Sequence, residues 1–269
     1  MTVRIEKDGA VTTVIHDRPH ARNAIDPESA DALVAAFLAF DQDEAAAVAV
    51  LWGAGGAFCA GWDLKYASTL SGPRPLADID FPEREPDDPN AVPRGPLGPS
   101  RLELSKPVIA AVAGPAVAGG MELALWCDFR VMEEDAYLGV YCRRWGVPLI
   151  DGGTVRLPRL VGQGRALEII LTGRKVPAEE CLRIGACEYL VPSGESRVKA
   201  EELAHEIARF PQACVRADRR SAHRQRGASV RQAMRFEWRN GLDCLAAEGI
   251  GGAANFAGGL GRHGDFSRI

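Results

Sequence analysis

Two acidic residues stand beside glycine-rich turns, and both are candidates for moving protons. Glu122 lies in GGMELALWCD, directly after the glycine pair at 119–120. Asp151 lies in GVYCRRWGVPLIDGGT, residues 139–154. Carboxyl groups act as general acids and bases where the fold shifts their pKa toward neutrality. Both also have structural explanations, because an acidic residue at a helix start complements the helix dipole or caps the first turn.

Two glycine turns could bind a negatively charged oxygen. They are GAGGAFCAGWDLK (53–65) and AVAGPAVAGGMELALWCD (111–128), and each connects a buried strand to a helix start. A helix start leaves main-chain N–H groups without partners, and glycine allows a substrate to approach the backbone closely. If the turns face each other, two N–H groups point at one oxyanion. Each turn alone is equally explained as a strand-to-helix connection.

The surrounding pattern predicts an α/β fold. VRIEKDGAVTTVIHD reads as a β-hairpin, IDPESADALVAAFLAFDQD as a helix, and AVAVLWG and KPVIAAVAG as buried strands. FRVMEEDAYLGV reads as two short strands about an acidic turn. Alternating strands and helices followed by helices alone predict an α/β core over 1–195 and a C-terminal helical section over 196–269.

Several details of the later helices are also predicted. GGTVRLPRLVGQGRALEIILTG is helical with breaks near Pro158 and at 162–164, and residues 211–250 are largely helical. In SRVKAEELAHEIARF, one apolar face carries Leu203, Ile207 and Phe210.

Composition excludes several classes of function. The 269 residues carry a formal net charge of −4, which gives no sign of a nucleic-acid partner. The apolar runs are too short to span a membrane, and the N-terminus has no signal-peptide pattern. The seven cysteines lack metal-ligand spacing, so we expect reduced thiols in a cytoplasmic protein, no metal site and no dinucleotide fingerprint. The proline-rich segment 71–100 reads as an exposed loop, a lid or a partner contact.

Taken together and in this order, four segments resemble the crotonase (enoyl-CoA hydratase/isomerase) superfamily. They are RPHARNAI (18–25), GAFCAGWDLK (56–65), KPVIAAVAGPAVAGGMELALWCDFRV (106–131) and the region 138–192 that begins LGVYCRRWG. The resemblance implies a spiral of ββα units with C-terminal helices that assemble a homotrimer or a hexamer. It also implies a fatty acyl-CoA thioester as substrate, with no cofactor beyond the coenzyme A that the substrate carries.

The resemblance assigns roles to individual residues. The oxyanion of a thioester enolate would accept hydrogen bonds from the main-chain N–H groups of Trp62 and Gly119. The bulky side chain of Trp62 would either line the acyl pocket or belong to the core. Glu122 matches the first catalytic glutamate of the hydratases.

Coenzyme A itself would lie along two of the matching segments. Ala60, Asp63 and Leu64 match the turn around its adenine and pantetheine, while Arg22 and Ala24 match positions near its phosphates and adenine. Arg22 is chemically suited to phosphate, although a surface salt bridge would explain it equally.

One matching position departs from the family pattern. Cys142 stands where hydratases carry a second glutamate, and a thiol does not replace a carboxylic acid. Asp151 matches a functional aspartate of dienoyl-CoA isomerases and 4-chlorobenzoyl-CoA dehalogenases, or else it caps the following helix. Arg143 or Arg144 would pair with Asp151, with Glu122 or with an acidic substrate end, or would form a solvated or inter-subunit salt bridge.

The predicted activity is hydration or double-bond isomerisation of an enoyl-CoA through an oxyanion-stabilised enolate. Two alternatives stay open. One is hydrolase or dehalogenase-like chemistry with Asp151 as nucleophile, and the other is a CoA-thioester-binding protein with little catalysis.

Overall fold

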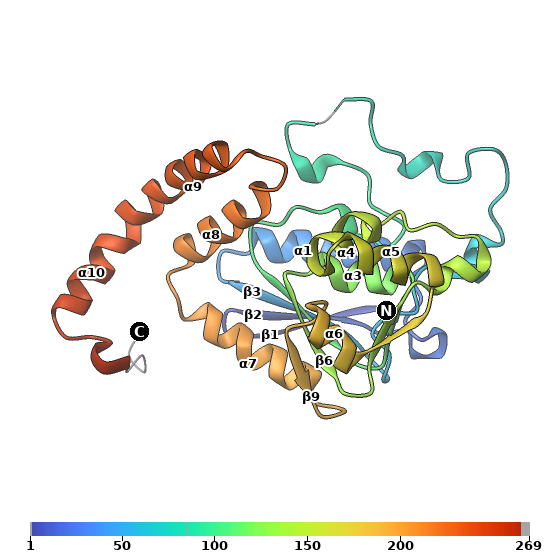
Figure 1. The fold of residues 1–269 in the computed structure, drawn as a ribbon, viewed down its shortest axis with the longest axis horizontal. Helices are drawn as coiled ribbons and strands as arrows, with labels where there is room; N and C mark the ends of the chain where they lie inside the picture. The colour runs from blue at the N-terminus through green and yellow to red at the C-terminus, as the bar shows by residue number, and fades with distance from the viewer. Residues whose placement is uncertain (1, 85, 265–269) are drawn as a thin grey trace.

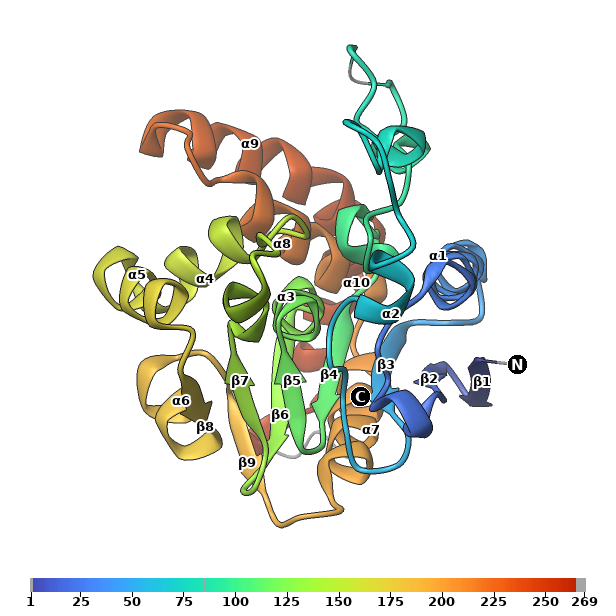
Figure 2. The ribbon, with the colours of Figure 1, turned by 90° about the vertical axis from the view of Figure 1, so that its right-hand side faces the viewer.

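The structure, a computed structural model, describes residues 2–84 and 86–264, and these residues form two β-sheets (Figures 1 and 2). The larger sheet contains, in spatial order, β1 (Val3–Asp8), β2 (Val11–His16), β3 (Val48–Gly53), β4 (Val108–Val112), β6 (Phe129–Glu133) and β9 (Tyr189–Val191). The smaller sheet contains β5 (Pro115–Val117), β7 (Tyr137–Gly139) and β8 (Lys175–Pro177). Pairs β1–β2 and β7–β8 are antiparallel and the other pairs are parallel, which confirms the predicted α/β class.

The helix α1 (Pro27–Gln42) makes the crossover between the parallel strands β2 and β3, as the sequence predicts. It begins where predicted, because the Asp26 side chain accepts a hydrogen bond from the Ser29 N–H at 2.9 Å. Its buried face, which includes Leu33 and Phe37, packs into the main core.

Helices cover both faces of the larger sheet. Helices α1 and α3 (Gly119–Trp126) lie on one face, and α7 (Ser196–Ala208) lies on the other (Figure 1). Successive residues of β3 alternate between the two cores, with Leu51 facing one and Val50 the other. Thus the first helix of the section 196–269 is packed directly on the sheet of the core.

The predicted apolar face of α7 is partly wrong. Leu203 and Ile207 pack against the sheet as predicted, but Phe210 lies beyond the end of the helix and is 44% exposed. The closest packing comes instead from Ala200 and Ala204, which are fully buried. Small side chains let the helix approach the strands closely, and a hydrophobicity pattern does not distinguish this from packing by large residues.

The helical segment after β7 is broken once rather than twice. Helix α4 (Gly153–Val161) runs through Pro158, so the break predicted there is wrong, and α5 (Gln163–Thr172) follows at once. The chain turns at Gly162, whose φ of +81° favours glycine. Shorter helices are α2 (Leu64–Ala67), α6 (Ala178–Ile184) and the 3₁₀ turns at Pro19–Ala21, Ala77–Ile79, Pro89–Ala91, Pro99–Arg101, Tyr141–Trp145 and Arg262–Gly264.

The C-terminal helices form an arm at one end of the molecule (Figure 1). They are α8 (Gln212–Arg224), α9 (Val230–Cys244), a π-helical turn (Leu245–Gly249) and α10 (Ile250–Ala257). Neither α9 nor α10 contains a buried residue. Residues 265–266 of the glycine-rich tail and residue 85 of the loop 71–100 lie outside the described residues. Within the part of the chain that is described, no helix has both the length and the apolar character needed to cross a bilayer.

A buried asparagine fixes the first glycine turn. Asn23 is fully buried, and its Nδ2 donates to the carbonyl oxygens of Ala54 and Ala57 at 2.8 and 2.7 Å. Its Oδ1 accepts from the Arg18 N–H at 2.7 Å. Its φ of +55° is one that asparagine tolerates better than most residues. The asparagine in the RNA segment at 22–24 therefore holds the turn that leads to Trp62.

We expect Asn23→Ala to lower the free energy of unfolding by about 3 kcal/mol, because three buried hydrogen bonds are lost at about 1 kcal/mol each. Urea denaturation followed by circular dichroism measures this value. The control is Asn90→Ala, because Asn90 makes its side-chain bonds to the Glu103 backbone at the surface. Equal losses in the two variants would show that Asn23 does not hold the turn.

Candidate active site

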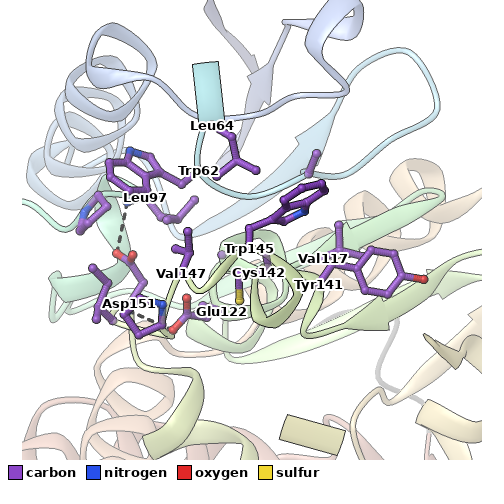
Figure 3. Close-up of a pocket in the computed structure, with 16 residues that line it drawn as sticks. Trp62, Leu64, Leu97, Val117, Glu122, Tyr141, Cys142, Trp145, Val147 and Asp151 are labelled. Carbon is purple, nitrogen blue, oxygen red and sulfur yellow. Dashed lines mark hydrogen bonds between the residues drawn. The ribbon is translucent and has the colours of Figure 1, made fainter. Parts of the chain in front are cut away.

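A cavity of about 200 Å³ lies between the two glycine turns and the segment 141–151 (Figure 3). Its wall is mostly apolar, with two carboxyl groups among the lining side chains. The lining residues are Ala60, Trp62, Leu64, Pro96, Leu97, Val117, Ala118, Gly119, Glu122, Tyr141, Cys142, Trp145, Val147, Pro148, Ile150 and Asp151. The structure therefore brings Glu122, Asp151, Trp62 and Gly119 to one pocket, as the sequence predicts for the reacting groups.

Glu122 is held in the first turn of α3, and its side chain is buried. Its Oε1 accepts hydrogen bonds from the main-chain N–H groups of Asp151 and Gly153, at 2.9 and 2.8 Å. The pKa of this carboxyl is raised to about 7, mainly by burial and to a smaller extent by the neighbouring Asp151 charge. Because Oε1 is occupied by two donors, a proton on Glu122 resides on Oε2.

Asp151 does not cap the helix that follows it, so that alternative is wrong. The N-cap position of α4 is Gly152, and no side chain caps it. Instead, Asp151 Oδ1 accepts hydrogen bonds from the Leu97 N–H at 3.2 Å and from the Ser100 hydroxyl. Its other oxygen, Oδ2, is buried without a hydrogen-bond partner among the described residues. Burial raises the pKa of Asp151, while the bonds to Oδ1 oppose that shift.

The two glycine turns touch each other. Gly61 and Gly119 are so close that a Cβ on Gly61 would lie 2.9 Å from the Gly119 nitrogen. Gly119 is the first residue of α3, so its N–H has no acceptor within the helix. Trp62 pairs with Ile25 in a parallel bridge whose bonds use the Gly61 oxygen and the Asp63 N–H. This geometry leaves the Trp62 N–H on the side away from Ile25.

The structure shows the surroundings of two further residues of the pocket wall, Trp62 and Cys142. The Trp62 ring is half-buried, packs against the main core and also lines the pocket, so both explanations apply. Cys142 is buried at the pocket wall, and burial raises the pKa of its thiol, so it is a neutral lining group.

The arginines beside Cys142 do not reach the acids. Arg143 Nε donates to the carbonyl oxygen of Ile170 at 3.3 Å, and the Arg144 guanidinium lies 4.0 Å from the centre of the Tyr141 ring. The predicted pairing of either one with Asp151 or Glu122 is therefore wrong.

Of the residues expected to contact coenzyme A, Ala60 and Leu64 line the pocket, whereas Arg22, Ala24 and Asp63 are not among its lining residues. Arg22 is exposed, and its carbonyl oxygen accepts the Ala60 N–H at 3.0 Å, which brings the segment 22–24 against Ala60. Leu64 is 42% exposed and Ala24 is half-buried. The Asp63 carboxylate is engaged by the protein itself, as described next.

Asp63 organises the chain near the pocket through an arginine that the sequence did not single out. Its carboxylate accepts from the Lys65 N–H at 2.9 Å, which caps α2, and pairs with Arg18 at 3.1 Å. Arg18 also pairs with Asp26 at 3.1 Å. The Asp63 N–H also donates to the Ile25 carbonyl oxygen at 2.9 Å, and its own carbonyl oxygen accepts from the Ala67 N–H at 2.9 Å, so Asp63 is engaged within the protein through its side chain and its backbone.

Sequence reasoning missed the groups that contact Asp151. Leu97 and Ser100 lie in the proline-rich segment, whose buried end has no periodic pattern, and Ser100 is more than 50 residues away from Asp151 in the chain. The burial of both residues inside a loop of this composition is visible only in the structure.

Metal chemistry finds no support in the described residues. Among them, no group of three or more histidine, cysteine, aspartate or glutamate side chains is placed to hold a metal ion. The pocket instead combines main-chain N–H groups with two carboxyls, which suits stabilisation of an oxyanion together with proton transfer.

Comparison with known proteins identifies relatives over most of the chain. A family model described as enoyl-CoA hydratase/isomerase matches residues 6–81 and 97–248. The enoyl-CoA hydratase EchA19 of Mycobacterium tuberculosis (strain ATCC 25618 / H37Rv) is 34% identical over 251 residues, which cover 91% of this chain and 88% of the relative. A carnitinyl-CoA dehydratase of Salmonella arizonae is 35% identical over 237 residues, covering 87% of this chain and 85% of the relative.

Solved structures agree with the sequence matches. An enoyl-CoA hydratase subunit I from Geobacillus kaustophilus HTA426 superposes with a TM-score of 0.86 at 30% identity, covering 96% of this chain and 95% of that one. An enoyl-CoA hydratase from Mycobacterium tuberculosis H37Rv gives a TM-score of 0.83 at 30% identity and covers 95% of both chains. These matches confirm the fold expected from the sequence.

The buried Glu122 makes stability depend on pH. The pKa of Glu122 is about 7 in the folded state, against an ordinary value of 4.5. The free energy of unfolding is therefore highest below pH 4.5, where the carboxyl is protonated in both states, and it falls as pH rises through 7. We expect Glu122→Gln, which stays neutral, to be about 3 kcal/mol more stable than the parent at pH 8, with the difference vanishing near pH 4.5.

Urea denaturation of both proteins between pH 4.5 and 8 measures this difference. The exposed Glu134 supplies the control, because Glu134→Gln removes an exposed carboxylate and should give a difference that does not vary with pH. A constant difference for Glu122→Gln as well would mean that the folded pKa is not raised.

Proposed function

Because this chain belongs to the enoyl-CoA hydratase/isomerase family, of crotonase fold, we propose that its pocket catalyses reversible addition of water to a 2-enoyl-CoA thioester. One observation carries the proposal. Two carboxyls, Glu122 and Asp151, line one mostly apolar pocket beside two touching turns, in which the Trp62 and Gly119 N–H groups have no acceptor among the described residues. The relatives named enoyl-CoA hydratase and carnitinyl-CoA dehydratase support water addition or removal as the reaction class.

The thioester carbonyl would accept hydrogen bonds from the Trp62 and Gly119 N–H groups. As water adds, negative charge develops on this oxygen, and fixed donors stabilise it without reorganisation. Loss of one such donor costs about 3 kcal/mol in comparable sites. Gly120 makes the close approach feasible, because a Cβ there would collide with the Cys59 carbonyl oxygen.

The two carboxyls divide the proton transfers between them. Glu122, whose pKa is raised to about 7, supplies the acid, and Asp151, whose Oδ1 accepts two hydrogen bonds that favour the ionised form, supplies the carboxylate. A water on Asp151 Oδ2 attacks Cβ and gives a proton to Asp151 as the C–O bond forms. Glu122 protonates Cα as the enolate collapses, and the product is a 3-hydroxyacyl-CoA.

The size and polarity of the pocket indicate the acyl group. A dry cavity of about 150 Å³ accommodates benzene, so about 200 Å³ suits a short chain or a single ring. No lysine or arginine is among the lining residues described, so nothing in this cavity pairs with a negatively charged acyl end. We therefore expect compact, uncharged enoyl groups, as in the β-oxidation of short fatty acids.

Double-bond isomerisation and chemistry through a nucleophilic Asp151 remain the rivals. Isomerisation would use the same two carboxyls to move a proton between Cα and Cγ. A nucleophilic Asp151 would form an aspartyl adduct, which mass spectrometry detects as a mass increase on the peptide that contains residue 151.

Assembly and location complete the proposal. The arm presents an apolar stripe made of Val230, Met234, Trp238, Leu242 and Leu245, which are 41–77% exposed. Their spacing of three or four residues places them on one helical face, which supports a homotrimer or a dimer of trimers. All seven cysteines are described and all are free thiols, which supports a cytoplasmic enzyme. We propose no cofactor beyond coenzyme A, and neither nucleic acid nor membrane as partner.

We expect measurable hydration of trans-2-enoyl-CoA, and a loss in kcat of about 10²- to 10⁴-fold in both Glu122→Gln and Asp151→Asn, with CoA-thioester binding retained. The rate should fall as pH rises through about 7, because Glu122 must be protonated. Loss of enoyl-thioester absorbance measures turnover, and Glu134→Gln is the matched control. Turnover by both variants at the parent rate would contradict the mechanism, and an adduct on Asp151 would favour the nucleophilic alternative.

We expect Trp238→Glu to dissociate the assembly, because it places a charge on the exposed stripe of α9. Light scattering after size exclusion measures the mass. The control is Arg239→Glu, which changes an adjacent position outside that stripe. A monomeric parent protein would contradict the proposed assembly.

A further inference from the structure

The segment 95–101 contacts the Asp151 carboxylate, whereas Glu122 accepts from the main-chain N–H of Asp151. The Ser100 side chain is buried, and its hydroxyl donates to Asp151 Oδ1, the same oxygen that accepts the Leu97 N–H. Gly95 packs so tightly against this pair that a Cβ there would collide with both Asp151 Oδ1 and the Ser100 hydroxyl. Three residues of one loop therefore hold one oxygen of Asp151, and the other oxygen is buried with no hydrogen-bond partner among the described residues.

A second layer fixes the position of the serine. Arg156, from the first turns of α4, donates through one nitrogen to the Asp151 carbonyl at 2.9 Å and through another to the Ser100 carbonyl at 2.8 Å. One guanidinium thus joins the backbone of the loop to the backbone of the acid. Its rigid planar fork suits this bridging, which the flexible ammonium group of a lysine reproduces poorly.

The loop itself is anchored on its outer side. Arg101, next to Ser100, donates to the carbonyl oxygens of Ile79 and Pro93 at 2.7 and 3.2 Å. Arg94 pairs with Asp31 of α1. The Arg101 bonds thus join parts of the proline-rich segment to each other, and the Arg94–Asp31 pair ties this segment to α1.

We propose that Ser100, supported by Arg156, is a positioning residue that holds Asp151 with its Oδ2 directed at the reacting carbons and favours the ionised carboxylate. This inference rests on the proposed role of Asp151 in proton transfer. A free carboxyl would rotate about its last side-chain bond and exchange its two oxygens. With Oδ1 engaged by a hydroxyl and an N–H, one orientation is preferred.

Other charges around Asp151 set the background for its titration. The positive charges of Arg101 and Arg156 lower the pKa of Asp151. The negative charge of Asp151 in turn raises the pKa of Glu122 in α3 and of the Cys59 thiol in the first glycine turn. Ser100 is uncharged, unlike the two acids and the two arginines. Replacing it therefore changes the hydrogen bonding to the Asp151 carboxylate and leaves the net charge of the site unchanged.

The test compares Ser100→Ala with the parent enzyme in hydration of a short trans-2-enoyl-CoA. We expect kcat to fall about 10-fold with unchanged KM, and the ascending limb of the pH profile to move about one unit higher, because the carboxylate loses a donor that stabilises it. Ser100→Cys, which retains a weak donor, should lie between the two. In an Asp151→Asn background, Ser100→Ala should cause no further loss.

The control is Ser105→Ala, because Ser105 forms a serine–aspartate bond to Asp41 at 2.9 Å at the surface. It should leave kcat and the pH profile unchanged. Loss of activity in Asp151→Asn with a normal rate and profile in Ser100→Ala would overturn the positioning role and leave the proposed function standing. Full activity in Asp151→Asn would overturn the proton-transfer step and with it the role of Ser100.

Discussion

The two hydrogen bonds that Glu122 accepts from the start of α4 are the interaction on which the site depends. They join α3 to the turn that carries Asp151, because one of the donors is the N–H of Asp151 itself. The carboxyl that binds this turn thus also fixes the distance between the two acids. A buried carboxyl with only two neutral donors keeps a raised pKa, so the same geometry that positions the pair also favours the protonated form of Glu122.

The backbone supplies the other half of the site. Gly61 and Gly119 allow two turns, separated by more than 50 residues in the chain, to come into contact. The main core beneath them, built from the strands and from α1 and α3, fixes this approach. Because the proposed donors are main-chain N–H groups, side-chain variation at Trp62 changes the shape of the pocket without removing the donor.

Features of the fold and of the site are predictable from the sequence where residues close together in the chain determine them. The hairpin, α1 with its Asp26 cap and the glycine turns follow from spacing within a few residues, and so does the placement of Glu122 at a helix start. Phe210 was misplaced because periodicity does not specify where a helix ends. Asp151 was open to interpretation as a cap because capping is judged from local sequence, whereas its actual partners come from a distant loop. Asn23 and Arg18 were missed for the same reason.

The loop that contributes Ser100 explains how the pocket functions with a thiol at position 142. The proposed mechanism needs a group that accepts a proton from water, and the side chain of Cys142 cannot supply it because burial keeps the thiol protonated. Asp151 lines the same pocket, but without the loop it would be a desolvated carboxyl with no hydrogen bond to its side chain. The bonds from Leu97 and Ser100 compensate for that desolvation, since hydrogen bonds to an ionised group are among the strongest in proteins. The acid at position 151 and the conformation of the proline-rich segment therefore depend on each other. The loop stabilises the buried carboxylate through hydrogen bonds, and the same bonds hold the loop in its conformation.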